Sequence, residues 1–152
     1  MFRGLSASQV DSKGRITVPS HYRTMLVEEA NSALVVTIDT EHRCLLLYPF
    51  PQWQVIEEKL EQLPSFQPGA RRIQRLLIGH ATELELDRHG RILIPGLLRD
   101  YAELDKTAIL VGQGKKIEIW NEPLWEHERE TWLAAHVGGD YGVPPELSSL
   151  SL

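Results

Sequence analysis

The apolar positions in the first half of the chain alternate between strand spacing and helix spacing. Residues 15–18 alternate apolar and polar side chains, which predicts a short strand. Two further runs, 34–38 and 44–48, are rich in leucine and β-branched residues and flank a polar segment at 39–43. This arrangement predicts a hairpin.

Two helices are predicted from the other apolar positions of this half. Pro19 can open a short helix in which Tyr22 and Leu26 lie about one turn apart. Pro51 opens a longer helix with one apolar stripe at i, i+3, i+7 and i+10. The stripe consists of Trp53, Ile56, Leu60 and Leu63.

The second half of the chain repeats this order of elements. Its predicted elements are strands around 84–86 and 92–94, a short helix from Pro95, a hairpin of 109–111 with 117–120, and a helix from Asn121 to about 135. Between the halves, residues 69–78 predict a linking helix with exposed arginines.

A nine-residue motif marks the same point in both halves. Asp11-Ser-Lys-Gly-Arg15-Ile-Thr-Val-Pro19 recurs 76 positions later as Asp87-Arg-His-Gly-Arg91-Ile-Leu-Ile-Pro95. A repeat at a fixed offset indicates duplicated structural units. Each half is too small to bury its apolar faces well alone. We therefore expect an α+β fold in which two tandem, pseudo-symmetric β-α-β-β-α repeats form one composite, barrel-like core.

The repeat also predicts how the chain is divided. We expect a first repeat at 1–64, a linking basic helix at 65–79 and a second repeat at 80–136. Residues 137–152 begin with a glycine- and proline-rich stretch without periodicity, which predicts a flexible C-terminal tail.

The distribution of charge changes the meaning of the net charge. The chain of 152 residues has a net charge of −5, which by itself argues against nucleic acid as a partner. However, segments 1–24 and 67–99 each carry +3, so the rest of the chain carries −11. Because a binding surface depends on local charge, the two motif-containing segments are candidate surfaces for polyanions.

The motif residues suit two roles that the sequence alone does not separate. Gly14 and Gly90 suit turns that need a positive φ. The aspartates can accept hydrogen bonds from turn amides, or hold the arginine four residues later. An arginine held in this way can bond two acceptors on a phosphate or a guanine. The alternative is an internal Asp–Arg salt bridge that only closes the turn.

Further short segments give the chain a specific resemblance. They are Phe2-Arg-Gly4, Ser12-Lys-Gly-Arg-Ile with Pro19 after it, Tyr48-Pro, and Arg75-Leu-Leu-Ile-Gly79-His-Ala. Together with the paired motifs, they resemble the MraZ family of bacterial transcriptional regulators over all but about the last dozen residues. Each half is also similar to the AbrB/SpoVT class of DNA-binding modules.

The resemblance implies a sequence-specific DNA-binding regulator, expected to be a repressor, in the cytoplasm and associated with the nucleoid. It implies binding to short direct repeats in double-stranded DNA upstream of the division and cell-wall gene cluster, including the regulator's own promoter. It also implies assembly with itself into a ring-shaped homo-oligomer. The signature residues are Asp11 and Arg15 in the first motif and Asp87 and Arg91 in the second.

We expect the two copies to contribute unequally to DNA binding. Lys13 fills the basic position inside the first motif, whereas the second motif has His89, and a histidine is largely uncharged at neutral pH. Arg15, and Arg91 as its counterpart, are expected to reach groove edges or the phosphates beside them. The expected phosphate contacts are Arg3, Lys13, Arg71, Arg72 and Arg75.

Other kinds of function have weaker support in the sequence. The histidines and Cys44 lack zinc-site spacing, and no catalytic constellation stands out, so we expect neither a metal or cofactor nor an enzymatic activity. Neither a membrane span nor a signal peptide is visible, so we expect no membrane partner. A single cysteine fits a reducing cytoplasm. Two alternatives remain open, namely an AbrB-like antitoxin or interaction module and a purely structural ring scaffold.

Overall fold

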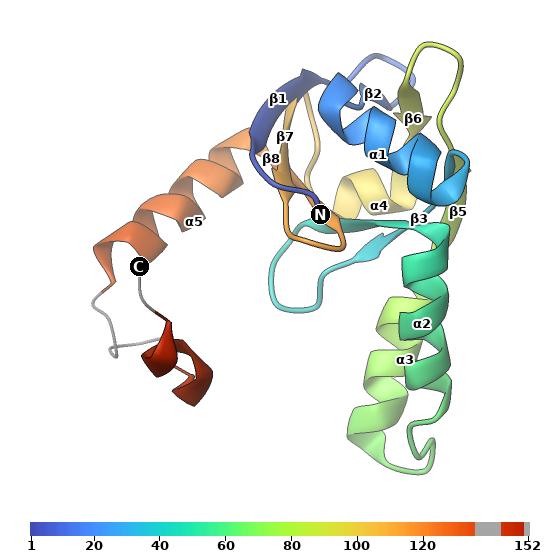
Figure 1. Cartoon of the computed structure of the whole chain (residues 1–152), viewed down its shortest axis with the longest axis vertical. Coiled ribbons are helices and arrows are strands. Elements are labelled where there is room, and N and C mark those ends of the chain that lie inside the picture. Colours follow the sequence, from blue (N-terminus) through green and yellow to red (C-terminus); the bar gives the residue numbers. More distant parts are fainter. Residues whose placement is uncertain (136–143, 151–152) are drawn as a thin grey trace. The chain divides into compact units, whose positions relative to one another are not determined.

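The computed structural model describes residues 1–135 and 144–150 (Figure 1). The chain divides into two compact units, Met1–Glu122 and Pro123–Leu152. Nearly all of the secondary structure lies in the first unit. Its elements are β1 (Leu5–Gln9), β2 (Arg15–Thr17), α1 (Ser20–Ala30), β3 (Ala33–Ile38), β4 (Leu45–Pro49), α2 (Phe50–Glu61), α3 (Pro68–His80), β5 (Thr82–Glu85), β6 (Arg91–Leu93), α4 (Gly96–Tyr101), β7 (Thr107–Gly112) and β8 (Ile117–Asn121).

The second unit holds α5 (Glu122–Ala134), apart from its first residue, and the short 3-10 helix η1 (Pro145–Ser149). In α5 the rings of Trp125 and Trp132 pack edge to face with centroids 6.0 Å apart. The predicted tail, 137–152, is described only over 144–150, and the rest of it lies outside the described residues.

The described strands form one large antiparallel sheet and one short ribbon. The sheet has the order β1-β7-β8-β4-β3-β5, and β2 pairs with β6 as a separate two-stranded sheet. Strands are exchanged between the halves of the chain, since β1 pairs with β7 and β5 pairs with β3. The α+β class and the tandem arrangement are thereby confirmed. The hydrogen bonds of the described residues define two separate sheets and not one closed barrel.

Strand β1 is the one strand among the described residues that the apolar pattern did not predict, and the short 3-10 helix η1 lies in the predicted tail. The sequence of β1, Leu-Ser-Ala-Ser-Gln, contains only two apolar residues, and most of its side chains are at least partly exposed. Pairing with β7 holds it in the sheet. Each half therefore has one strand before the motif and one within it, namely β1 then β2, and β5 then β6.

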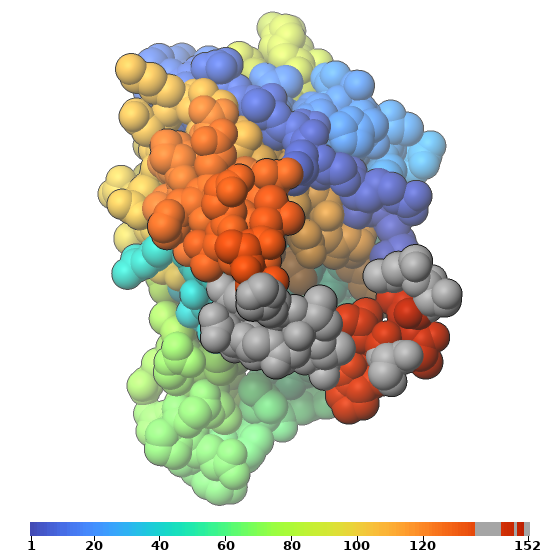
Figure 2. All heavy atoms as spheres, turned by 90° about the vertical axis from the view of Figure 1, so that its left-hand side faces the viewer, coloured from blue at the N-terminus to red at the C-terminus, as the bar shows by residue number. Residues whose placement is uncertain are grey.

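The two faces of the large sheet support different structures. On one face, Leu34, Val36 and Leu47 pack with Ile16 and Ile92 of the ribbon in the main core. On the other face, Val35 and Tyr48 pack with Trp53 of α2 in a smaller core that α3 also contacts. The ribbon and the α2–α3 hairpin thus lie on opposite faces of the sheet. Figure 1 shows α2 and α3 extending away from the ribbon, and Figure 2 shows their green atoms at the lower end of the view.

A buried hydrogen bond fixes α3 against the sheet. Thr37 on β3 is fully buried, and its hydroxyl donates to the Leu77 carbonyl of α3 at 2.7 Å. None of the described helices is long and apolar enough to cross a membrane.

Candidate nucleic-acid interface

Each motif forms a tight turn that an aspartate organises. The Asp11 carboxylate accepts the backbone N–H groups of Lys13 and Arg15, both at 2.9 Å. The Gly14 N–H donates to the Asp11 carbonyl at 3.0 Å, and Gly14 has φ +85°. A residue with a Cβ is strained at this φ, so the glycine is required by the turn.

The second motif repeats this turn in detail. The Asp87 carboxylate accepts the N–H groups of His89 at 2.8 Å and Arg91 at 2.9 Å, and Gly90 has φ +74°. The turn chemistry expected from the spacing is therefore present in both copies.

The same aspartates orient the two arginines. Nε of Arg15 lies 2.6 Å from Oδ2 of Asp11, and Nε of Arg91 lies 3.0 Å from Oδ2 of Asp87. The arginine side chains stay about 30% exposed, at 30% and 28%. Both ion pairs occupy Nε, so the two Nη groups at the end of each guanidinium can still donate to a ligand. The sequence left two roles open for each Asp–Arg pair, a salt bridge that closes the turn and an arginine oriented for a ligand. This geometry allows both roles at once.

The turn amides also keep both carboxyl groups ionised. The pKa of Asp11 is lowered from 3.8 to about 2, chiefly by the backbone N–H of Arg15, with smaller contributions from the Arg15 side chain and the Lys13 N–H. The backbone N–H of Arg91 is likewise the main reason that the pKa of Asp87 is lowered. The arginines are therefore held by carboxylates at any physiological pH.

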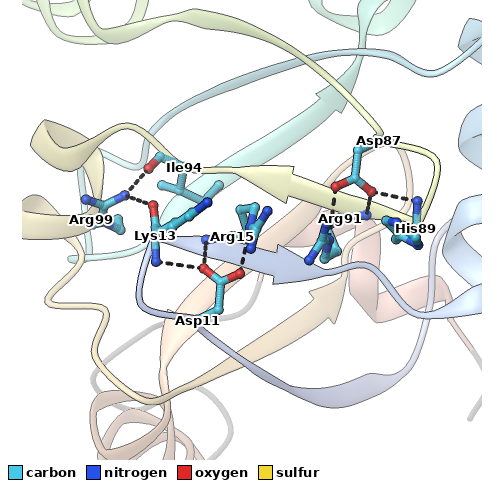
Figure 3. A network of polar contacts seen from close by, with 8 residues as sticks. All are labelled: Asp11, Lys13, Arg15, Asp87, His89, Arg91, Ile94 and Arg99. Atoms are coloured by element: carbon cyan, nitrogen blue, oxygen red, sulfur yellow. Dashed lines mark hydrogen bonds and ion pairs between the residues drawn. The ribbon is translucent and has the colours of Figure 1, made fainter.

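The register of the ribbon places the two arginines on one surface. Ile16 pairs with Ile92, and these equivalent residues of the two halves both point into the core with no exposed surface. Because side chains alternate along a strand, Arg15 and Arg91 point to the opposite, outer face. Figure 3 shows the two Asp–Arg networks side by side along the ribbon.

Two further arginines support the turns from the opposite half of the chain. Nη1 of Arg99 donates to the Ile94 carbonyl at 2.7 Å and to the Lys13 carbonyl at 3.2 Å. A Cβ built on Gly14 would lie 1.7 Å from the same Nη1 atom. Arg23 occupies the equivalent place at Gly90, where a Cβ would lie 2.2 Å from Arg23 Nη1.

Sequence reasoning did not assign a role to Arg23 or Arg99. The available signal was their spacing, since they are separated by the same 76 positions as the motifs. Backbone hydrogen bonds also connect each motif to the other half of the chain. The Val18 N–H donates to the Gly90 carbonyl at 2.9 Å, and the Ile94 N–H donates to the Gly14 carbonyl at 3.1 Å.

The structure brings only some of the predicted site residues together. Asp11, Gly14, Asp87 and Gly90 form the turns, Arg15 and Arg91 lie on the ribbon, and Lys13 is exposed on the first turn. In the second turn, the exposed His89 ring accepts a hydrogen bond from Nε of Arg88 at 3.3 Å.

The other predicted phosphate contacts lie elsewhere. Arg3 precedes β1, at the end of that strand away from the first turn. The remaining three are exposed on α3, on the sheet face opposite the ribbon. They are Arg71, Arg72 and Arg75. In one copy of the chain, these four residues are thus not neighbours of the ribbon.

One group of possible metal ligands occurs in the described residues, between the β3–β4 hairpin and strand β8. Asp39, Cys44 and Glu118 each place one ligand atom within 4.8 Å of the others. Burial, with the negative charges of Glu118 and Asp39, raises the pKa of the Cys44 thiol, and its Sγ donates to Asp39 at 3.5 Å. In this geometry the protonated thiol acts as a hydrogen-bond donor within the hairpin.

Known proteins resemble this chain over its whole length. A family described as "MraZ protein, putative antitoxin-like" matches residues 1–76 and 77–135. A protein from Coxiella burnetii (strain RSA 493 / Nine Mile phase I) is 61% identical over 152 residues, and one from Legionella pneumophila (strain Paris) is 54% identical. One from Halorhodospira halophila is 49% identical. In each comparison both chains are covered completely, and each relative is named "Transcriptional regulator MraZ".

Proposed function

The chain belongs to the MraZ family, and from this premise we propose that it is a sequence-specific, DNA-binding regulator of transcription that reads duplex DNA with the β2–β6 ribbon. The names of its relatives support the regulatory role, and they describe a non-enzymatic one. The prediction that the chain is not an enzyme is confirmed by this agreement.

The observation that carries the proposal is the pair of aspartate-held arginines on the outer face of the ribbon. The major groove of B-DNA admits a two-stranded ribbon, and an arginine can bond O6 and N7 of guanine with its two terminal nitrogens. Since Asp11 holds Arg15 through Nε, the guanidinium is oriented before binding, and less side-chain entropy is lost. We therefore assign guanine recognition to Arg15 and Arg91.

Phosphate contacts are assigned to the cations around the ribbon. Lys13 and Arg88 are exposed on the two turns, at opposite ends of the paired arginines. These contacts would hold the ribbon in register along the groove. For Arg3 and the three α3 arginines, a phosphate contact stays a prediction from sequence.

We propose that several copies act together as a ring-shaped homo-oligomer. One ribbon offers few contacts, so one copy should bind weakly, whereas linked copies gain from effective concentration at neighbouring sites. A ring uses head-to-tail interfaces, which present its ribbons in the same sense and suit short direct repeats. We propose that these repeats lie upstream of the division and cell-wall gene cluster, including the chain's own promoter, and that binding represses transcription there. The protein would then act in the cytoplasm, in association with the nucleoid.

The test is a titration of DNA from upstream of the chain's own gene with wild type, Arg15→Ala and Lys59→Ala at several salt concentrations. Lys59 is exposed on α2, so its substitution removes one positive charge away from the ribbon. We expect a steep salt dependence, a loss of about tenfold to a hundredfold for Arg15→Ala, and little loss for Lys59→Ala. Equal binding by wild type and folded Arg15→Ala would rule out guanine recognition by Arg15.

The family description contains the word "antitoxin", so an antitoxin module is a second candidate function. An antitoxin module would use a segment with apolar anchors to bind its toxin. Leu147 and Leu150, at 42% and 56% exposed, are such residues in the described part of the tail. Removal of residues 144–152 would abolish partner binding in that case and would leave DNA affinity unchanged. A structural ring scaffold, in contrast, would show no salt-dependent affinity for DNA.

A further inference from the structure

The outer face of the ribbon carries two apolar groups beside its two arginines. Arg15 pairs with Leu93 across the ribbon, and Arg91 pairs with Thr17. All four side chains point away from the core, because Ile16 and Ile92 between them point into it. The face therefore consists of two rows. Each row has one arginine and one side chain with at least one methyl group, namely Leu93 beside Arg15 and Thr17 beside Arg91.

Leu93 is unusually exposed for a leucine in a paired strand. Its side chain is 53% exposed, whereas Ile92 and Ile94 on either side of it are fully buried. Thr17 is also exposed. The ribbon backbone is fixed at this point, since Ser8 Oγ donates to the Thr17 carbonyl at 2.7 Å. An apolar side chain held beside an oriented arginine has a defined position relative to whatever that arginine binds.

We infer that Leu93 and Thr17 form a subsite for the 5-methyl group of thymine, so that each row of the ribbon reads a thymine close to a guanine. This inference rests on the proposed function, because it uses the same ribbon in the same groove. Among the four standard DNA bases, only thymine has a methyl group on the major-groove edge, and apolar side chains discriminate it by contact with that group. Cross-strand neighbours lie about 5 Å apart and adjacent bases about 3.4 Å apart, so one row of the ribbon spans between one and two base steps.

The two rows should differ in strength. Thr17 and Leu93 occupy equivalent positions in the two motifs, 76 residues apart, but leucine offers more apolar surface than the single methyl of threonine. Since Leu93 lies opposite Arg15, the row with the larger apolar group also contains the shorter ion pair, at 2.6 Å against 3.0 Å. The stronger thymine preference is therefore expected from the Arg15–Leu93 row.

The experiment removes only the methyl group from the DNA. The upstream duplex is prepared once with thymine and once with uracil at every thymine position, and both forms are titrated with wild type and Leu93→Ala. Wild type should bind the thymine form roughly fourfold tighter for each methyl buried. Leu93→Ala should bind the thymine form more weakly and should lose most of this preference. Leu93→Val should retain part of it, which a general folding defect would not allow.

Leu5→Ala is the matched control, since Leu5 is 55% exposed on β1 but does not lie on the ribbon. It should keep the full preference for thymine. Equal binding of both duplexes by wild type would overturn the thymine subsite and leave the proposed function intact, whereas no binding to either duplex would overturn both. If Leu93→Ala changed the oligomer observed by native mass spectrometry and kept the thymine preference, Leu93 would be an assembly contact, and the inference would be wrong.

Discussion

The Arg99 guanidinium donates a hydrogen bond to the Lys13 carbonyl at 3.2 Å, although the two residues are 86 positions apart. Arg99 follows the second motif, and Lys13 lies inside the first. Arg23 lies in the same way against Gly90 of the second motif. Each motif turn is thus built by one half of the chain and supported by the other, so the two motifs behave as one structural unit.

Substitution of Arg99 should weaken DNA binding without direct loss of a groove contact. Arg99→Ala removes both hydrogen bonds to backbone carbonyls, which should cost about 1–2 kcal/mol of unfolding free energy and leave the first turn less ordered. We expect a loss of DNA affinity with an unchanged salt slope, measured by fluorescence anisotropy at several salt concentrations. Arg99→Lys should restore part of the affinity. A reduced slope would instead identify Arg99 as a phosphate contact.

Gly14→Ala should destabilise the chain for two separable reasons. The new Cβ would clash with Arg99 Nη1, and alanine is strained at φ +85°. We expect a loss of about 2 kcal/mol or more in urea unfolding. The double variant Gly14→Ala/Arg99→Ala should recover the part that comes from the clash. Gly69→Ala in α3 is the control, because its Cβ meets no atom within 4 Å, and it should be close to neutral. Additive effects at positions 14 and 99 would contradict the clash.

The sequence predicted those parts of the fold in which a regular apolar pattern coincides with the repeated motif. Ile16 and Ile92 could be recognised as equivalent from the offset of 76, and both could be placed in the core. Their pairing with each other could not be predicted, because a repeat shows which residues are equivalent but not which ones touch. Strand β1 was missed because pairing with β7, and not its own composition, determines its conformation.

The candidate site was predictable only in part, for a related reason. The Asp–Arg pairs are local, four residues apart, so their spacing already indicated the contact. The supports from Arg23 and Arg99 are long-range contacts with backbone and glycine, which leave no pattern in neighbouring residues. Local charge placed the arginines of α3 in the same basic segment, 67–99, as the second motif, but the sheet separates the ribbon from these arginines.

The acid titration of Asp11 tests the geometry of the first turn. Its pKa in the folded chain is about 2, below the ordinary 3.8, so its contribution to stability is complete above pH 4 and is lost as the pH falls toward 2. Arg15→Ala should leave the pKa still below 3.8, because the largest cause is the backbone N–H of residue 15, which alanine retains. Carboxyl-carbon NMR measures both values. An ordinary pKa in Arg15→Ala would show that the ion pair dominates instead.

The arginines of α3 provide a test of how many surfaces contact the DNA. Replacement of Arg71, Arg72 and Arg75 by alanine together should change the affinity for a duplex with a single site by less than about threefold, since α3 lies on the face opposite the ribbon. The same variant with a longer duplex of several repeats reports on neighbouring subunits. A loss as large as that of Arg15→Ala on the single site would support the phosphate contacts predicted from the sequence.

An exchange of Lys13 and His89 should reveal whether the two turns contribute unequally. Both residues follow the motif aspartate by two positions, and both donate their backbone N–H to that aspartate, so the exchange alters the side chains and preserves the turns. His89→Lys adds a positive charge beside Arg88 and should raise the affinity about two- to fivefold, with a salt slope steeper by about one. Lys13→His should reduce the affinity and the salt slope by similar amounts. The double variant Lys13→His/His89→Lys should have an affinity and a salt slope close to those of wild type. If His89→Lys leaves the affinity and the slope unchanged while Lys13→His lowers both, the second turn does not approach the phosphates, and the DNA contact is centred on the first motif.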